Sequence, residues 1–158
     1  MRLSIFVLSM LFFSACSYGK KDILGDENCV LNGQVCLIAK DDDKFLVVEN
    51  KEYPSVSYYD EVEIKKINNN KFQVINSYSD KSPIVIYSSF ILKDGVLNLS
   101  SIRTISYPNL SPRGAKQECD VELNNVFEKP LQYYVDNFVF DLSEREKLMV
   151  CKLNKNTN

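Results

Sequence analysis

The chain has 158 residues, of which 45% are hydrophobic, and its 19 basic and 21 acidic side chains leave a formal net charge of −2. Because charges of both signs are scattered along the chain, no basic surface for nucleic acid is expected. The chain contains no histidine, which excludes a Ser-His-Asp or Cys-His site, a histidine general base and a histidine zinc site.

The N-terminus predicts an export signal. Met1 and Arg2 precede an apolar run at 3–13, roughly 11 residues long, which suits the core of a signal peptide and is too short to span a membrane. We therefore assign residues 1–15 to a signal peptide. An ordinary cleavage site after Ala15 would require a small residue where Phe13 stands, so another processing route is favoured.

Residues 11–16, Leu-Phe-Phe-Ser-Ala-Cys, resemble the lipobox of bacterial lipoproteins. The resemblance implies that Cys16 is the lipidated first residue of the mature protein and that 16–28 is a short tether. It also implies a periplasmic location, and Ser17 is compatible with anchoring to the outer membrane of a Gram-negative cell. The alternative is an ordinary secretory signal, which would leave Cys16 as an incidental thiol.

Four cysteines remain when Cys16 is set apart, an even set that is typical of two disulfides in an oxidising compartment: Cys29, Cys36, Cys119 and Cys151. Three pairings are possible in principle. Asn32-Gly33 predicts a two-residue type I′ hairpin that places Cys29 opposite Cys36, which leaves Cys119 to pair with Cys151. The competing interpretation is a set of four zinc ligands. It lacks a C-x2-C knuckle, so we expect no metal and no cofactor.

Strand-like runs follow one another along the chain, with turn residues about 8 to 12 residues apart. In chain order they are 35–39, 45–49, 61–65, 72–78, 84–92, 96–107, 121–123 and 148–153. One short helix is expected after Pro130, because Pro is favoured as a first helical residue. Its apolar side chains recur at helical spacing and are expected to cover the sheet: Leu131, Tyr134, Val135 and Phe138.

These elements predict a mainly β fold, an antiparallel meander forming a sandwich or small barrel, with one short covering helix and two disulfides. The single β-rich domain is expected to span 29–153, and the polar residues 154–158 are expected to form a frayed tail.

The segment 108–116 has no strand periodicity, and two prolines stiffen it, which lowers the entropy lost on binding. Arg113 lies in a Pro-Arg-Gly setting that favours a turn. Since arginine and tyrosine are favoured interface anchors, we expect partner-binding residues here: Tyr107, Asn109, Ser111, Arg113 and Lys116. The alternative is an ordinary exposed loop.

A second candidate is the segment 53–61, which is rich in tyrosine and flanked by acidic residues. Tyr58 and Tyr59 suit a hydrated, polar protein interface. Alternating core and surface positions in a strand would produce the same pattern.

No catalytic residue is assigned. A glycosidase needs only two carboxylates, and 41–43 and 60–63 are rich in them. These acidic residues lie beside turn residues or alternate along a strand, so we interpret them as solvated turns and faces.

A binding function is therefore favoured by elimination. In its setting the chain resembles periplasmic immunity proteins and lipoprotein lysozyme inhibitors, which implies that it neutralises a protein partner in the cell envelope, either a toxin or a cell-wall-degrading enzyme. One alternative is a structural or assembly lipoprotein of an envelope secretion or pilus machine that pairs through its sheet edges. Another is a carboxylate-based cell-wall glycosidase.

Overall fold

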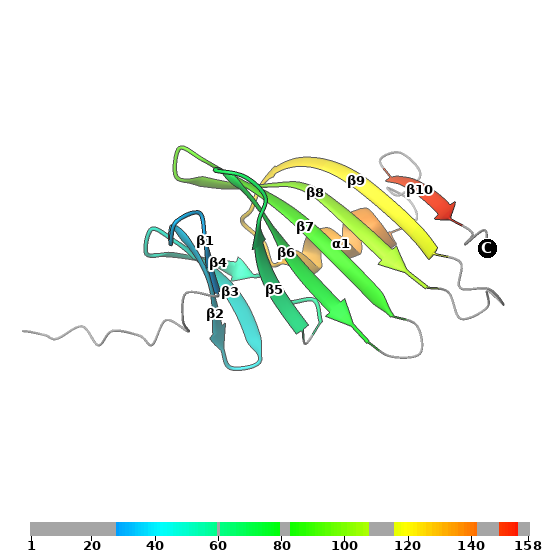
Figure 1. Cartoon of the computed structure of the whole chain (residues 1–158), viewed down its shortest axis with the longest axis horizontal. Coiled ribbons are helices and arrows are strands. Elements are labelled where there is room, and N and C mark those ends of the chain that lie inside the picture. Colours follow the sequence, from blue (N-terminus) through cyan, green and yellow to red (C-terminus); the bar gives the residue numbers. More distant parts are fainter. Residues whose placement is uncertain (1–27, 60, 80–82, 108–115, 142–148, 155–158) are drawn as a thin grey trace, which may run out of the picture.

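The structure, a computed structural model, describes residues 28–59, 61–79, 83–107, 116–141 and 149–154 (Figure 1). In this part of the chain the backbone forms ten strands and one short helical segment: β1 (Cys29–Val30), β2 (Val35–Lys40), β3 (Asp43–Val48), β4 (Lys51–Ser55), β5 (Glu61–Lys66), β6 (Lys71–Tyr78), β7 (Ile84–Lys93), β8 (Val96–Ser106), β9 (Lys116–Val126), α1 (Leu131–Val135), η2 (Asp136–Phe140) and β10 (Met149–Asn154). The predicted signal peptide and Cys16 lie outside the described residues.

The strands form two antiparallel sheets, in which neighbours in the sheet are also neighbours in the sequence. The smaller sheet has the order β1-β2-β3-β4, and the larger has the order β10-β9-β8-β7-β6-β5. The prediction of a mainly β, antiparallel meander is thereby confirmed, in the form of two sheets. In Figure 1 the small sheet lies beside β5, and the helix crosses behind the larger sheet.

Both predicted disulfides are present. Cys29 lies opposite Cys36 in the β1–β2 hairpin, and Cys119 lies opposite Cys151 in the β9–β10 pair, with Cα atoms 4.1 Å apart in each bridge. Asn32 and Gly33 have φ values of 58° and 81°, as a type I′ turn requires. Leu31 also has a positive φ, 54°, although its side chain is buried in the core.

One apolar core joins the two sheets and the helix. The inner face of the larger sheet carries a row of fully buried side chains: Phe72, Val74, Ile86, Phe90, Leu99, Ile102 and Val121. Phe127, just after β9, packs edge-on against Phe90 with ring centroids 5.0 Å apart and stacks on Tyr134 of α1 at 5.6 Å. This aromatic chain places the helix over the inner face, as the helical spacing predicts.

The helix differs from the prediction in its detail. Pro130 precedes the first helical residue instead of occupying it, and after Val135 the backbone widens into the π-helical turn η2. Leu131, Tyr134 and Val135 are buried as expected, whereas Phe138 is only partly buried. None of the helices in the described residues is long and apolar enough to cross a membrane.

Strand β4 has no counterpart among the predicted strands. Its sequence, Lys-Glu-Tyr-Pro-Ser, has one buried side chain, Tyr53, and contains Pro54. Proline cannot donate to a sheet ladder, and β4 is an edge strand, which is where a strand tolerates proline.

Candidate partner-binding site

The segment that follows β4 is held in place by one buried amide on β6. The Asn76 side-chain oxygen accepts hydrogen bonds from the backbone nitrogens of Tyr58, at 2.7 Å, and Tyr59, at 3.3 Å. The Asn76 amide nitrogen in turn donates to the carbonyl of Val56 at 3.1 Å. Asn76 is fully buried, so these three bonds form away from bulk solvent and fix the backbone of 56–59 against the larger sheet.

The same segment is tied to the small sheet on its other side. The backbone nitrogen of Lys44 donates to the Ser57 hydroxyl at 2.7 Å, and the nitrogen of Val56 donates to the carbonyl of Lys44 at 2.8 Å. The Ser55 hydroxyl donates to Asp43 at 3.0 Å. Residues 56–59 therefore bridge the two sheets, and their side chains are positioned by both.

Four aromatic rings pack together where this segment meets the end of β6 and the end of η2. Tyr58 packs edge-on against Tyr59 with centroids 4.9 Å apart, and it stacks on Phe140 at 6.1 Å. Tyr59 stacks on Tyr78 at 5.2 Å. We call these four residues the aromatic cluster. Tyr58 and Tyr59 are half-buried, whereas Tyr78 and Phe140 are 42% and 45% exposed, so the cluster presents apolar rings to solvent.

A shallow, open hollow lies beside the aromatic cluster. It has a volume of about 480 Å³ and is lined by residues from the β2–β3 turn, the start of β3, the bridging segment and α1: Asp42, Asp43, Ser57, Tyr58, Tyr59 and Gln132. We call it the acidic hollow, because Asp42 and Asp43 are the charged residues among its described lining.

A carboxylate lies against one tyrosine of the cluster, Tyr58. The Tyr58 hydroxyl donates to Asp136 at 3.1 Å. Burial, this hydrogen bond and the charge of Asp136 raise the pKa of Tyr58 well above its ordinary value, and burial with the nearby Tyr78 raises the pKa of Tyr59. Both phenols therefore hold their protons more strongly than an ordinary tyrosine does, and the Tyr58 hydroxyl acts as a hydrogen-bond donor.

The structure describes two of the residues predicted in and beside the proline-containing loop, Tyr107 and Lys116. Tyr107 follows β8 and is 40% exposed. Lys116 begins β9 and pairs with Glu118 at 2.6 Å. The other three predicted residues, Asn109, Ser111 and Arg113, lie outside the described part of the chain.

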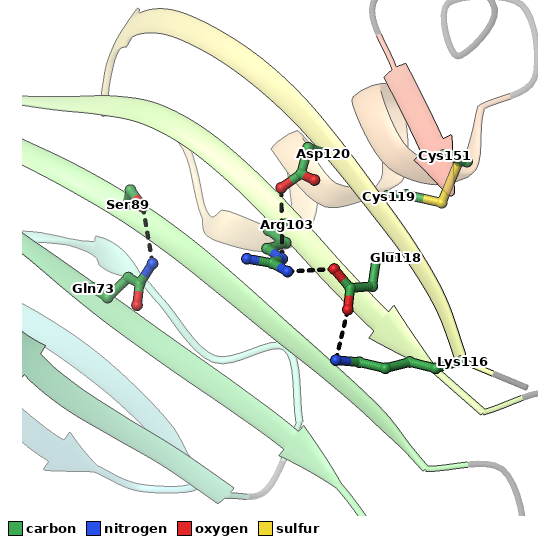
Figure 2. Close-up of polar contacts among 8 residues, drawn as sticks. All are labelled: Gln73, Ser89, Arg103, Lys116, Glu118, Cys119, Asp120 and Cys151. Atoms are coloured by element: carbon green, nitrogen blue, oxygen red, sulfur yellow. Dashed lines mark hydrogen bonds and ion pairs between the residues drawn. A yellow bond between two sulfur atoms is a disulfide. The ribbon is translucent and has the colours of Figure 1, made fainter. Parts of the chain in front are cut away.

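Lys116 belongs to a charge network on the outer face of the larger sheet, the face opposite the helix (Figure 2). Glu118 also pairs with Arg103, which lies 3.7 Å from a carboxylate oxygen of Asp120. Hydrogen bonds from Lys116 and Arg103 lower the pKa of Glu118, and Glu118 raises the pKa of both cations. Because acids and bases balance within this network, it offers no net charge to a partner.

The two predicted segments approach the same end of the larger sheet. Tyr78 pairs with Ile84, and Ile84 pairs with Ser106, the residue before Tyr107. Among the described residues, no hydrogen bond or ring contact joins Tyr107 to the aromatic cluster. Of the predicted partner-binding residues that the structure describes, Tyr58 and Tyr59 belong to the aromatic cluster and line the acidic hollow.

Several members of this surface were not predicted from the sequence. Asn76 and Tyr78 lie in a predicted strand, Asp136 lies within the predicted helix and Phe140 follows it, and 41–43 was interpreted as a solvated turn. Within the residues that the structure describes, no group of three or more cysteine, aspartate or glutamate side chains could hold a metal ion. Comparisons with protein families, with curated proteins and with solved structures find no match to this chain.

Proposed function

We propose that this chain is an exported, disulfide-stabilised binding protein that captures and neutralises a protein partner in the cell envelope, a toxin or a cell-wall-degrading enzyme. Its contact surface is formed by the aromatic cluster and the acidic hollow. The single observation that carries the proposal is the packing of four rings: two lie on a segment that both sheets hold in place, and the other two, Tyr78 and Phe140, are over 40% exposed.

The composition of this surface supports a protein interface. Tyrosine and phenylalanine are enriched in the buried centres of interfaces, and a few such residues supply most of the binding energy. Tyrosine adds large contact area with few rotatable bonds, and its hydroxyl bonds well in a hydrated rim. An apolar cluster beside a polar hollow combines both kinds of contact.

The rigidity of the segment supports the same function. A surface that is already ordered loses less conformational entropy on binding than a free loop does. Here Asn76 anchors the backbone at Tyr58 and Tyr59, Ser57 accepts from Lys44, and Asp136 orients the Tyr58 ring. The two disulfides suit an oxidising compartment, which agrees with the export signal expected from the sequence.

The test is site-specific photo-crosslinking in cells that make the full chain. A photoreactive phenylalanine analogue replaces Phe140 in one variant and Val96 in a matched control. Both positions are exposed to a similar degree, but Val96 lies at the opposite end of the larger sheet. We expect a specific protein adduct from position 140 and none from position 96.

The crosslinked protein is then purified and its affinity for the mature domain measured. Phe140→Ala is expected to weaken binding at least 30-fold, as for a hot-spot residue worth about 2 kcal/mol, while Val96→Ala binds normally. Excess mature domain should abolish the activity of a toxin or enzyme partner. A partner that is an inactive component of a secretion or pilus machine would instead support the assembly alternative, and equal binding by both variants would refute the proposed surface.

A further inference from the structure

We propose that the acidic hollow receives a cationic side chain, arginine in preference to lysine, from the protein partner. This inference rests on the proposed function, because it specifies the chemistry of the partner residue that enters the same surface. It commits to a basic contact residue on a protein, as opposed to a sugar or a small acid.

The first argument is charge. Asp42 and Asp43 line the hollow, and none of the other lining residues that the structure describes is basic. Asp43 accepts a hydrogen bond from the Ser55 hydroxyl, whereas Asp42 has no ion-pair partner among the described residues. Lys40, two residues before Asp42, is engaged elsewhere, with Glu52 at 3.2 Å and over the ring of Phe45 at 5.7 Å. Among the described residues, the two carboxylates therefore carry negative charge that no cation of the chain pairs with.

The second argument is the aromatic wall. Tyr58 and Tyr59 line the hollow beside the aspartates. A guanidinium group stacks on aromatic faces and donates two parallel hydrogen bonds to a carboxylate, whereas an ammonium group does neither as well. A wall of tyrosine next to a pair of carboxylates matches both properties of arginine. Ser57 and Gln132 add neutral oxygens that can accept further N–H groups.

The third argument is shape. At about 480 Å³ the hollow lies within the usual range of about 300–1,000 Å³ for ligand sites, yet it is shallow and open. It therefore suits a side chain that projects from a partner surface. A sugar ring stacks best on a broad, flat aromatic platform, but the Tyr58 and Tyr59 rings lie at 87° to each other and do not form one.

The inference is tested by nuclear magnetic resonance titration of the mature, oxidised domain with three blocked tripeptides, Gly-Arg-Gly, Gly-Lys-Gly and Gly-citrulline-Gly. Citrulline keeps the shape of arginine but is neutral. We expect the arginine peptide to shift the backbone amide signals of Ser57, Tyr58 and Gln132 with a dissociation constant in the range of about 1–10 mM, which suits a single side chain. The lysine peptide should bind more weakly, and the citrulline peptide at least fivefold more weakly than the arginine peptide.

Matched variants separate the hollow from general electrostatic attraction. Asp42→Asn and Asp43→Asn should each weaken binding of the arginine peptide about fivefold, since each removes one of the two carboxylates. The control Glu63→Gln removes an exposed acid from the edge strand β5 and should leave binding unchanged. Equal binding of the citrulline peptide, equal effects of all three variants, or binding of an N-acetylglucosamine oligomer in place of the arginine peptide would overturn the inference.

The purified partner distinguishes this inference from the proposed function. If Phe140→Ala weakens the complex while Asp42→Asn and Asp43→Asn do not, the binding function stands and the arginine site is wrong. If neither kind of variant weakens the complex, both are wrong. The site is confirmed by two results together. The aspartate variants weaken the complex, and Asp42→Arg restores binding to a partner in which the contacting arginine has been changed to glutamate.

Discussion

The side-chain oxygen of Asn76 lies 2.7 Å from the backbone nitrogen of Tyr58 and 3.3 Å from that of Tyr59, so one buried amide positions two neighbouring tyrosines. The amide stands between Val74 and Tyr78 on β6, at a position where the alternation of the strand would place an apolar side chain. Asn76 is thus a polar exception in an apolar face, and it determines where the aromatic cluster stands.

Replacing Asn76 with alanine should destabilise the domain by about 2–4 kcal/mol, because two backbone N–H groups and one carbonyl lose their buried partner. Urea unfolding measures the change in the free energy of unfolding. The control is Asn98→Ala, which removes one long hydrogen bond of 3.4 Å near the surface and should cost no more than about 0.5 kcal/mol. Similar losses for both variants would contradict the role assigned to Asn76.

The two disulfides should differ in their contribution to stability. Cys119 and Cys151 are separated by 32 residues, and Cys29 and Cys36 by 7. In the chain-entropy model, replacing both cysteines with serine should cost about 4 kcal/mol for the long loop and about 2.5 kcal/mol for the short one. Thermal or urea unfolding of the two double variants gives the order, and the reverse order would show that the difference arises from effects other than loop length.

Removing the hydroxyl of Ser88 should not destabilise the domain. Ser88 is fully buried on the inner face, and its oxygen has no hydrogen-bond partner among the described residues. Since burying an unpaired hydroxyl is unfavourable, Ser88→Ala should leave the free energy of unfolding unchanged or raise it by up to about 1 kcal/mol. Ser100→Ala is the comparison, because the Ser100 hydroxyl donates to the carbonyl of Ser89 at 3.0 Å. A clear loss of stability in Ser88→Ala alone would reveal a hidden partner.

Acidification should weaken the charge network on the outer face. Hydrogen bonds from Lys116 and then Arg103 hold the pKa of Glu118 below its ordinary value. The network therefore stabilises the folded domain fully above the ordinary glutamate pKa of about 4.3. This stabilisation is lost as the pH falls through the lower pKa of the folded state. Melting temperatures measured from pH 7 to about pH 3 should therefore fall less steeply for Glu118→Gln than for the wild type. Glu63→Gln should follow the wild-type curve, and identical curves for all three proteins would contradict the prediction.

Ionisation of Tyr58 should respond to Asp136. Burial first, then the hydrogen bond to Asp136 and its charge, raise the pKa of Tyr58, so Asp136→Ala should move the ionisation of Tyr58 to lower pH. The ultraviolet absorbance of tyrosinate follows this ionisation during alkaline titration. Asp120→Ala removes a carboxylate of the outer face instead and should leave the titration unchanged; a shift in that variant would mean that general charge, not the Tyr58 contact, controls the ionisation.

The sequence could predict much of the fold because local signals agreed with one another. Asn32-Gly33 predicted the hairpin register, which placed Cys29 opposite Cys36 and left Cys119 for Cys151. Strand β4 was missed because it has one buried side chain and a proline. The widening of the helix at Asp136 also carried no local signal, because it depends on how the turn packs over the sheet.

The candidate site was harder to predict because it is assembled from distant segments. Tyr58 and Tyr59 could be chosen on composition alone, but their ring partners Tyr78 and Phe140 lie far along the chain, on β6 and η2. Asp42 and Asp43 carry the sequence pattern of a solvated turn, which their exposure agrees with. Only the bridging of the two sheets by 56–59 brings this turn beside the tyrosines.

The bridge between Cys119 and Cys151 also has a consequence for proteolysis. A single cut of the backbone anywhere between these two residues leaves both fragments covalently joined, and β10 remains beside β9 through its own ladder of hydrogen bonds. A nicked molecule would therefore migrate as one chain until its disulfide is reduced. Its edge strand β10 would stay paired with β9 although the backbone between them had been cut.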